Sequence, residues 1–202
     1  MVRQDERRSR TRAAILAAAT EKFGSVGFAE TTVDSIASDA SVAKGAVYHH
    51  FRNKDELFEC VFETVSSDLA QSVASAAQTR GEPLESLMEA VKTYFRLCSD
   101  PAIARITLQD APGVLGYERW RALDTAHFGS LVTGGLGFAM QAGAIAPQPL
   151  APLSKIVLAA IQAAALDCAA QDDFDASAST YVETLEGLLA GLASKNQSVN
   201  QG

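Results

Sequence analysis

The sequence predicts an all-α protein of about nine helices. Alanine and leucine dominate it, and no segment shows the alternation of β-branched and polar residues that is typical of a half-buried strand. Glycine or proline interrupts the helical pattern at intervals of roughly 15–25 residues. Hydrophobic residues make up 48% of the 202 and charged residues 20%, so the chain can bury a core, and disordered and collagen-like classes are excluded.

Local signals place the helix ends. Gly24 stands where the first helix would end, and Thr31 or Thr32 caps the second. Asn53 opens the fourth in a capping box, and the sequence around Pro112 and Gly113 predicts a break. The nine predicted helices cover residues 9–23, 33–39, 43–51, 54–79, 84–98, 101–109, 117–141, 152–171 and 176–193.

Charge divides the chain unevenly, although the net charge of −7 alone argues against a nucleic-acid partner. Residues 1–54 contain nine lysines and arginines against six acids, and the remainder contains eight against eighteen. Such asymmetry predicts a small basic head that meets a polyanion and an acidic body that does not. We therefore divide the chain into a head (residues 1–55), a helical body (56–193) and a disordered polar tail (194–202).

Three cysteines, Cys60, Cys98 and Cys168, occur without a CxxC pair or close histidines. This spacing argues against a zinc ribbon, a redox motif and a disulfide framework, and predicts free thiols in a reducing compartment. The sequence predicts no cofactor and no metal site. The arginine-rich N-terminal segment is not followed by the long apolar run of a signal peptide. Gln162 and Asp167 interrupt the longest apolar stretch of the chain, so it is too short for a membrane span. We therefore expect a cytoplasmic protein.

Residues 31–54 have the outline of a helix-turn-helix, in which two short helices joined by a tight turn precede a long helix. On the third predicted helix, Ala43, Val47 and Phe51 form the buried stripe, which leaves Lys44 and Tyr48 on the outer face. Lysine can donate to guanine or to phosphate, and tyrosine can pack against a thymine methyl group. For Tyr48 and His50 the alternative is that they are ordinary core or boundary residues. The N-terminal arginines have two interpretations, which are contacts with the minor groove or phosphates and a solvated tail.

This segment resembles the DNA-binding domain of the tetracycline-repressor (TetR) family of bacterial regulators. The matching residues are Gly27-Phe28, Thr31-Thr32-Val33-x-x-Ile36-Ala37, Val42-x-Lys44-Gly45-x-Val47-Tyr48-x-His50-Phe51 and Asn53-Lys54-x-x-Leu57. The resemblance implies a homodimer on a palindromic operator in double-stranded DNA and a small-molecule effector bound in the body. The residues to which we assign DNA contacts are Thr32, Ala43, Lys44, Gly45, Tyr48, His49, His50 and Lys54.

The body offers a predicted subunit interface. The helix over 152–171 is apolar almost all round, which predicts burial on two sides, and its copy in a second subunit is the simplest second side. The alternative is an interior helix of one subunit. The predicted interface residues are Leu153, Ile156, Val157, Ala160, Ala164, Leu185, Leu188 and Leu189.

A partly apolar effector would need a cavity among the helices of the body. The sequence identifies aromatic and titratable residues as its candidate walls, although each is also a candidate for plain core. They are Phe62, Phe95, Leu108, Trp120, His127 and Phe128.

Three functions remain open at this point. The first is a ligand-responsive, sequence-specific regulator, most simply a repressor. The second is a sequence-neutral architectural DNA-binding protein, against which the acidic body argues. The third is an all-helical enzyme using His127, Asp110 and a cysteine, but no nucleophile elbow, HExxH or paired-carboxylate motif supports it, so we predict a non-enzymatic protein.

Overall fold

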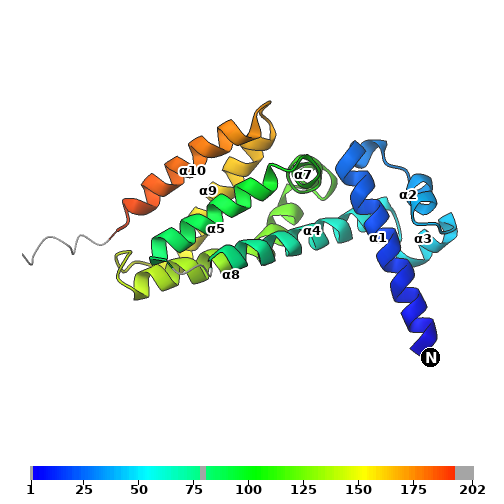
Figure 1. Cartoon of the computed structure of the whole chain (residues 1–202), viewed down its shortest axis with the longest axis horizontal. Coiled ribbons are helices and arrows are strands. Elements are labelled where there is room, and N and C mark those ends of the chain that lie inside the picture. The colour runs from blue at the N-terminus through cyan, green and yellow to red at the C-terminus, as the bar shows by residue number, and fades with distance from the viewer. Residues whose placement is uncertain (1, 78–80, 194–202) are drawn as a thin grey trace, which may run out of the picture. The chain divides into compact units, whose positions relative to one another are not determined.

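The computed structural model describes residues 2–77 and 81–193, with side chains from residue 5 onward (Figure 1). Over these residues the chain is helical, and its only β-type pairing is an isolated antiparallel bridge between Ile145 and Ala193. The all-α prediction is confirmed; the predicted tail, 194–202, lies outside the described residues. The elements are α1 (Val2–Glu30), α2 (Val33–Asp39), α3 (Lys44–His50), α4 (Lys54–Ala77), α5 (Pro83–Cys98), α6 (Pro101–Ala104), the π-helical η1 (Arg105–Asp110), α7 (Ala111–Val114), α8 (Tyr117–Gln141), α9 (Leu150–Ala169) and α10 (Phe174–Ala190).

The chain packs as two compact units. Unit 1 contains Met1–Ser66 and Asp100–Arg121, and unit 2 contains Ser67–Ser99 and Ala122–Gly202. This division differs from the predicted boundary after residue 55, because α6 and η1 pack against α1 and α7 continues from η1. Two long helices, α4 and α8, are each shared between the units.

The first helix is longer than the sequence predicted. It continues through Gly24, so the predicted end there was wrong. Glycine at this position serves close packing instead, because a Cβ atom on Gly24 would lie only 2.7 Å from the Cβ of Ala102. The interruption comes at Gly27, whose φ of 85° and ψ of 169° suit glycine alone. Asp110 Oδ2 accepts a hydrogen bond from the Phe28 amide at 2.7 Å, and Arg105 donates to the Gly24 carbonyl at 3.1 Å.

The predicted break around Pro112 was also wrong. The chain continues from α6 through η1 into α7 as one helical stretch. Residues 2–77 and 81–193 therefore contain nine helical stretches. Pro112 lies in the first turn of α7, directly after the π-helical η1. The helix ends instead before Gly116, whose φ of 79° requires a left-handed backbone.

Unit 2 is built from α5, α8, α9 and α10 with the second part of α4. Helices α9 and α10 pack against each other and against α5. By length and composition α9 is apolar enough to cross a membrane, and 44% of its most apolar window is buried inside the protein. Core helices of globular proteins also meet this description.

Candidate functional site

The corner between α2 and α3 holds a short helix in a fixed orientation. Thr32 caps α2 by accepting the Ser35 amide at 3.1 Å, and the left-handed Ser41 (φ 54°) makes the turn. Ile36 of α2 and Val47 of α3 are buried beneath the corner. Because one side of α3 is packed, its opposite side is held out from the protein.

The exposed side of α3 contains four of the eight residues to which the sequence assigns DNA contacts. Lys44, Gly45 and His49 are exposed, and Tyr48 retains 49% of its accessible surface. A Cβ atom added at Gly45 would meet no atom within 4 Å, so nothing inside the protein requires glycine there. Ala43 is the exposed residue before α3 and makes no side-chain cap.

Two ionisable residues of α3 have shifted pKa values. Lys44 Nζ lies 2.7 Å from Asp34 Oδ2, and this hydrogen bond raises the pKa of the exposed ammonium group. Partial burial lowers the pKa of His50, and His49, Arg8 and Arg12 act in the same direction. His50 is therefore disfavoured as a cation where it stands.

Lys54 has partners inside its own unit. Its ammonium group donates to the carbonyl of Phe28 at 2.8 Å and to that of Thr31 at 3.0 Å, and it lies 4.0 Å from the centre of the Phe28 ring. Two of its three N–H donors thus join the start of α4 to the turn after Gly27. A phosphate contact through the third donor stays a prediction.

Two of the N-terminal arginines lie close to the end of α3. The Arg12 guanidinium lies 5.1 Å from the Phe51 ring centre, and both Arg8 and Arg12 act on His50. These side chains therefore add positive charge beside α3. The signal was present as arginines at a spacing of four within a helical stretch.

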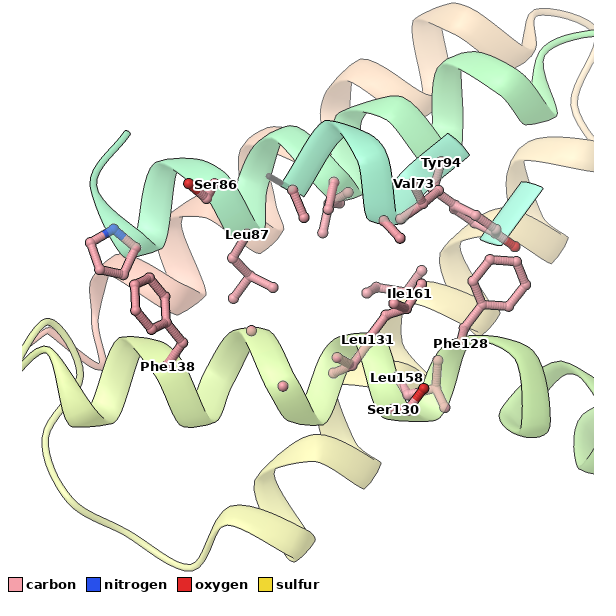
Figure 2. Close-up of a pocket in the computed structure, with 18 of the residues that line it drawn as sticks. Val73, Ser86, Leu87, Tyr94, Phe128, Ser130, Leu131, Phe138, Leu158 and Ile161 are labelled. Carbon is pink, nitrogen blue, oxygen red and sulfur yellow. The ribbon is translucent and has the colours of Figure 1, made fainter. Parts of the chain in front are cut away.

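Unit 2 contains a cavity of about 300 Å³. Figure 2 shows it between side chains of α5, such as Leu87 and Tyr94, and side chains of α8, such as Phe128. Residues of α4 and α9 complete the wall. The lining is mostly aliphatic and small, and its polar members are Ser86, Tyr94, Asp124, Ser130 and Gln162.

A buried carboxylate lies in this wall. Asp124 of α8 is only 6% exposed, and its Oδ2 accepts a hydrogen bond from Gln162 Nε2 of α9 at 2.6 Å. Burial raises the pKa of Asp124 to about 6 although the Gln162 hydrogen bond acts in the opposite direction. No lysine, arginine or histidine in the described part of the chain forms an ion pair with it.

Of the six predicted ligand residues, only Phe128 lines this cavity. Phe62, Leu108 and Trp120 are buried in unit 1, where the Trp120 indole donates to the Thr107 carbonyl at 2.9 Å. Phe95 is buried in unit 2 and His127 is half-buried there, but neither forms the cavity wall. Asp124 and Gln162 were not among the predicted ligand residues. For Gln162 the signal was a polar residue inside the apolar helix α9.

The predicted interface residues fall into two groups. Val157, Ala164, Leu185 and Leu189 are buried inside their own subunit. Ile156 and Leu188 keep 66% and 62% of their accessible surface, and Leu153 and Ala160 are half-buried. Only the second group can meet another molecule.

Two family models match the chain. One, described as "Bacterial regulatory proteins, tetR family", covers residues 15–61, and the other, "Tetracyclin repressor-like, C-terminal domain", covers residues 84–192, more than half of the chain. The chain belongs to the TetR family. The family consists of DNA-binding regulators, which supports the prediction of a protein that is not an enzyme.

Relatives of this TetR-family chain agree with that assignment. It is 41% identical over 64 residues to YhgD, an uncharacterized HTH-type transcriptional regulator of Bacillus subtilis, covering 32% of this chain and 34% of the relative. It is 35% identical over 80 residues to the HTH-type transcriptional regulator AcrR of Shigella flexneri, covering 39% and 37%. The chain therefore spans only about a third of the length of these curated relatives.

A solved structure matches nearly the whole TetR-family chain. It is a TetR-family transcriptional regulator from Pectobacterium atrosepticum, with a TM-score of 0.85 and 27% identity over 94% of this chain and 97% of the other. Both units of the present chain thus have counterparts in one known regulator.

Proposed function

We propose that this chain is a transcriptional repressor that binds a palindromic DNA operator as a homodimer in the bacterial cytoplasm, associates with the nucleoid when bound, and releases the operator when a partly apolar effector occupies the cavity of unit 2. The exposed face of α3 carries the proposal. It combines a donor, an aromatic ring and a glycine on a rigidly held helix. A helix of this kind fits the major groove.

The residues of that face have distinct expected roles. Lys44 and Tyr48 would contact base edges and the thymine methyl group, and His49 and His50 would add contacts nearby. Gly45 would allow the backbone of α3 to approach the bases. Thr32, Ala43 and Lys54 would fix the position of the head on the phosphates.

The ion pair between Lys44 and Asp34 refines this interpretation. Both side chains are exposed, and a surface ion pair of this kind contributes little to stability, so Lys44 can exchange Asp34 for DNA at small cost. Asp34 also places a negative charge beside the DNA-facing surface. Replacement of Asp34 by asparagine should therefore raise non-specific DNA affinity and lower the discrimination between operator and random DNA.

The proposed homodimer would form through an exposed apolar face of α9 and α10. Ile156 and Leu188 are among the most exposed large apolar residues of the chain, and Ala159, Ala163 and Gly187 on the same two helices are exposed and small. Small residues let helices approach closely. An isologous contact through this face would place two copies of α3 for two half-sites.

Selection from a random duplex pool tests DNA recognition. The purified chain should enrich a palindromic consensus whose half-sites lie about one helical turn or more apart. Replacing Lys44 or Tyr48 by alanine should weaken binding to the selected duplex by about 1–3 kcal/mol per half-site. Enrichment without a consensus would instead favour the architectural alternative.

Gly45→Ala separates DNA contact from folding. Because its Cβ atom would meet nothing, the substitution should stabilise α3 by about 0.5–1 kcal/mol in urea denaturation and yet weaken operator binding. Gly113→Ala is the matched control, since Gly113 is also helical and its added Cβ atom also meets nothing within 4 Å. If both variants bind the operator like the native chain, α3 does not approach the bases closely.

The oligomeric state tests the subunit interface. Light scattering should give the mass of a dimer for the native chain and of a monomer for Ile156→Glu. Val26→Glu is the control, because Val26 is 52% exposed on α1 of unit 1 and lies outside the proposed interface. A dimer that survives Ile156→Glu unchanged would reject this face as the interface.

A further inference from the structure

The cavity of unit 2 holds a negative charge that the protein itself leaves without a cation. The Asp124 carboxylate is 6% exposed, and its recorded hydrogen bond comes from the neutral amide of Gln162. A neutral donor satisfies one lone pair and leaves the net charge in place. Buried charges in proteins are normally paired or hydrogen-bonded on all sides, so this carboxylate marks a place for a charged partner.

The surroundings of Asp124 suit the organic part of such a partner. Tyr94 and Phe128 line the same cavity, with ring centres 5.3 Å apart in an edge-to-face arrangement. Aromatic faces attract cations, especially where water is excluded. Most other lining residues are aliphatic, including Leu87, Leu158 and Ile161.

Resting on the function proposed above, we propose that the effector is an apolar amine whose protonated nitrogen pairs with Asp124 while its hydrocarbon part fills the cavity. Folding has already removed most of the water around Asp124, so an incoming ammonium ion gains the ion pair without the further cost of dehydrating the carboxylate. A neutral alcohol would leave the Asp124 charge uncompensated, and a ligand carboxylate would be repelled by it. The order of affinity is therefore amine, then alcohol, then carboxylate.

Three probes of equal shape test this order: 4-phenylbutylamine, 4-phenylbutanol and 4-phenylbutyrate. Calorimetric titration of the full chain at pH 8 should show the amine binding about ten-fold or more tightly than the alcohol, and the carboxylate weakest. Asp124→Asn should abolish the advantage of the amine and leave the affinity for the alcohol within a few-fold. Asp172→Asn is the matched control, because Asp172 is exposed and lies outside the cavity.

The native chain provides a second measurement that does not depend on a variant. The preference for the amine should fall between pH 8 and pH 5 as Asp124 becomes protonated. The titratable groups that face Asp124 are Tyr94 and Cys98 of α5, whose pKa values burial raises, so both stay neutral across this range. His127 lies three residues after Asp124 on α8, so the same pH series is repeated with His127→Gln.

Equal binding of amine and alcohol, binding of none of the three probes, or an amine preference that survives Asp124→Asn would each overturn the proposal. So would a pH dependence that disappears in His127→Gln and persists in Asp124→Asn. DNA binding is measured separately with the selected duplex. If the amine binds without changing DNA affinity, the ligand class stands and the ligand-responsive part of the proposed function fails. If the chain binds DNA and no amine, the ligand class fails and DNA recognition stands.

Discussion

Asp124 makes a quantitative prediction about stability. Burial raises the pKa of this carboxyl group to about 6 from its ordinary 3.8. At about 1.4 kcal/mol per pKa unit, this difference corresponds to about 3 kcal/mol of folding free energy. Between pH 4 and pH 6 the folded chain retains a proton that the unfolded chain has released. The free energy of unfolding therefore falls as the pH rises through this window, and the loss is complete above it.

Asp124→Asn removes this dependence. The asparagine carbonyl can still accept the Gln162 hydrogen bond, and the side chain carries no charge at any pH. Its new NH₂ group needs a partner, which reduces the gain, so we expect the variant to be more stable than the native chain by about 1–3 kcal/mol at pH 7. Near pH 4 the two proteins should be almost equally stable.

Urea denaturation of both proteins between pH 4 and pH 8, at one protein concentration, measures the difference. Comparing the two chains cancels the titration of the other acids, and Asp172→Asn shows what removing an exposed charge does alone. A difference that stays flat with pH, or a variant less stable than the native chain at pH 7, would refute the reasoning.

Three further predictions concern packing around the first helix and one buried thiol. Asp110→Ala removes the acceptor 2.7 Å from the Phe28 amide and should destabilise the chain by about 1–3 kcal/mol, seen as a lower urea midpoint. Gly24→Val should lower the midpoint by a similar amount, about 1–3 kcal/mol, because the new Cβ atom would lie 2.7 Å from that of Ala102. Cys98 is buried and its pKa is raised to about 12, so a thiol reagent at pH 8 should leave it unmodified in the folded chain, as mass spectrometry can show; rapid modification would contradict its burial.

Much of the fold could be predicted because local signals decide it. The bounds of α2 and α8 match the prediction, and Thr32 caps α2 as one of the two predicted alternatives. The errors came where tertiary packing overrides local signals. Gly24 reads as a helix end but serves close packing against Ala102, and Pro112 reads as a break but occupies a first turn.

The exposed face of α3 could also be predicted, because burial of one side of a short helix determines what the other side exposes. The cavity could not be predicted in the same way. Large aromatic residues such as Trp120 are good candidates for a binding site, but they fill cores equally well, and Trp120 is 1% exposed. A cavity forms where side chains are small. The residues that distinguish it from plain core are its buried polar side chains, because burying a polar group costs free energy.

Retention of a charge at Asp124 therefore favours a role in binding over a role in stability. A carboxylate that lowers stability at neutral pH is expected where function requires it. Helix α8 belongs to both units, and it carries Asp124 in unit 2 and Trp120 one turn earlier in unit 1. The Trp120 indole is hydrogen-bonded to Thr107 of η1, and Asp110 at the end of η1 holds the Phe28 amide beside the Lys54 ammonium group. A ligand changes DNA affinity only if it binds one arrangement of these contacts better than another.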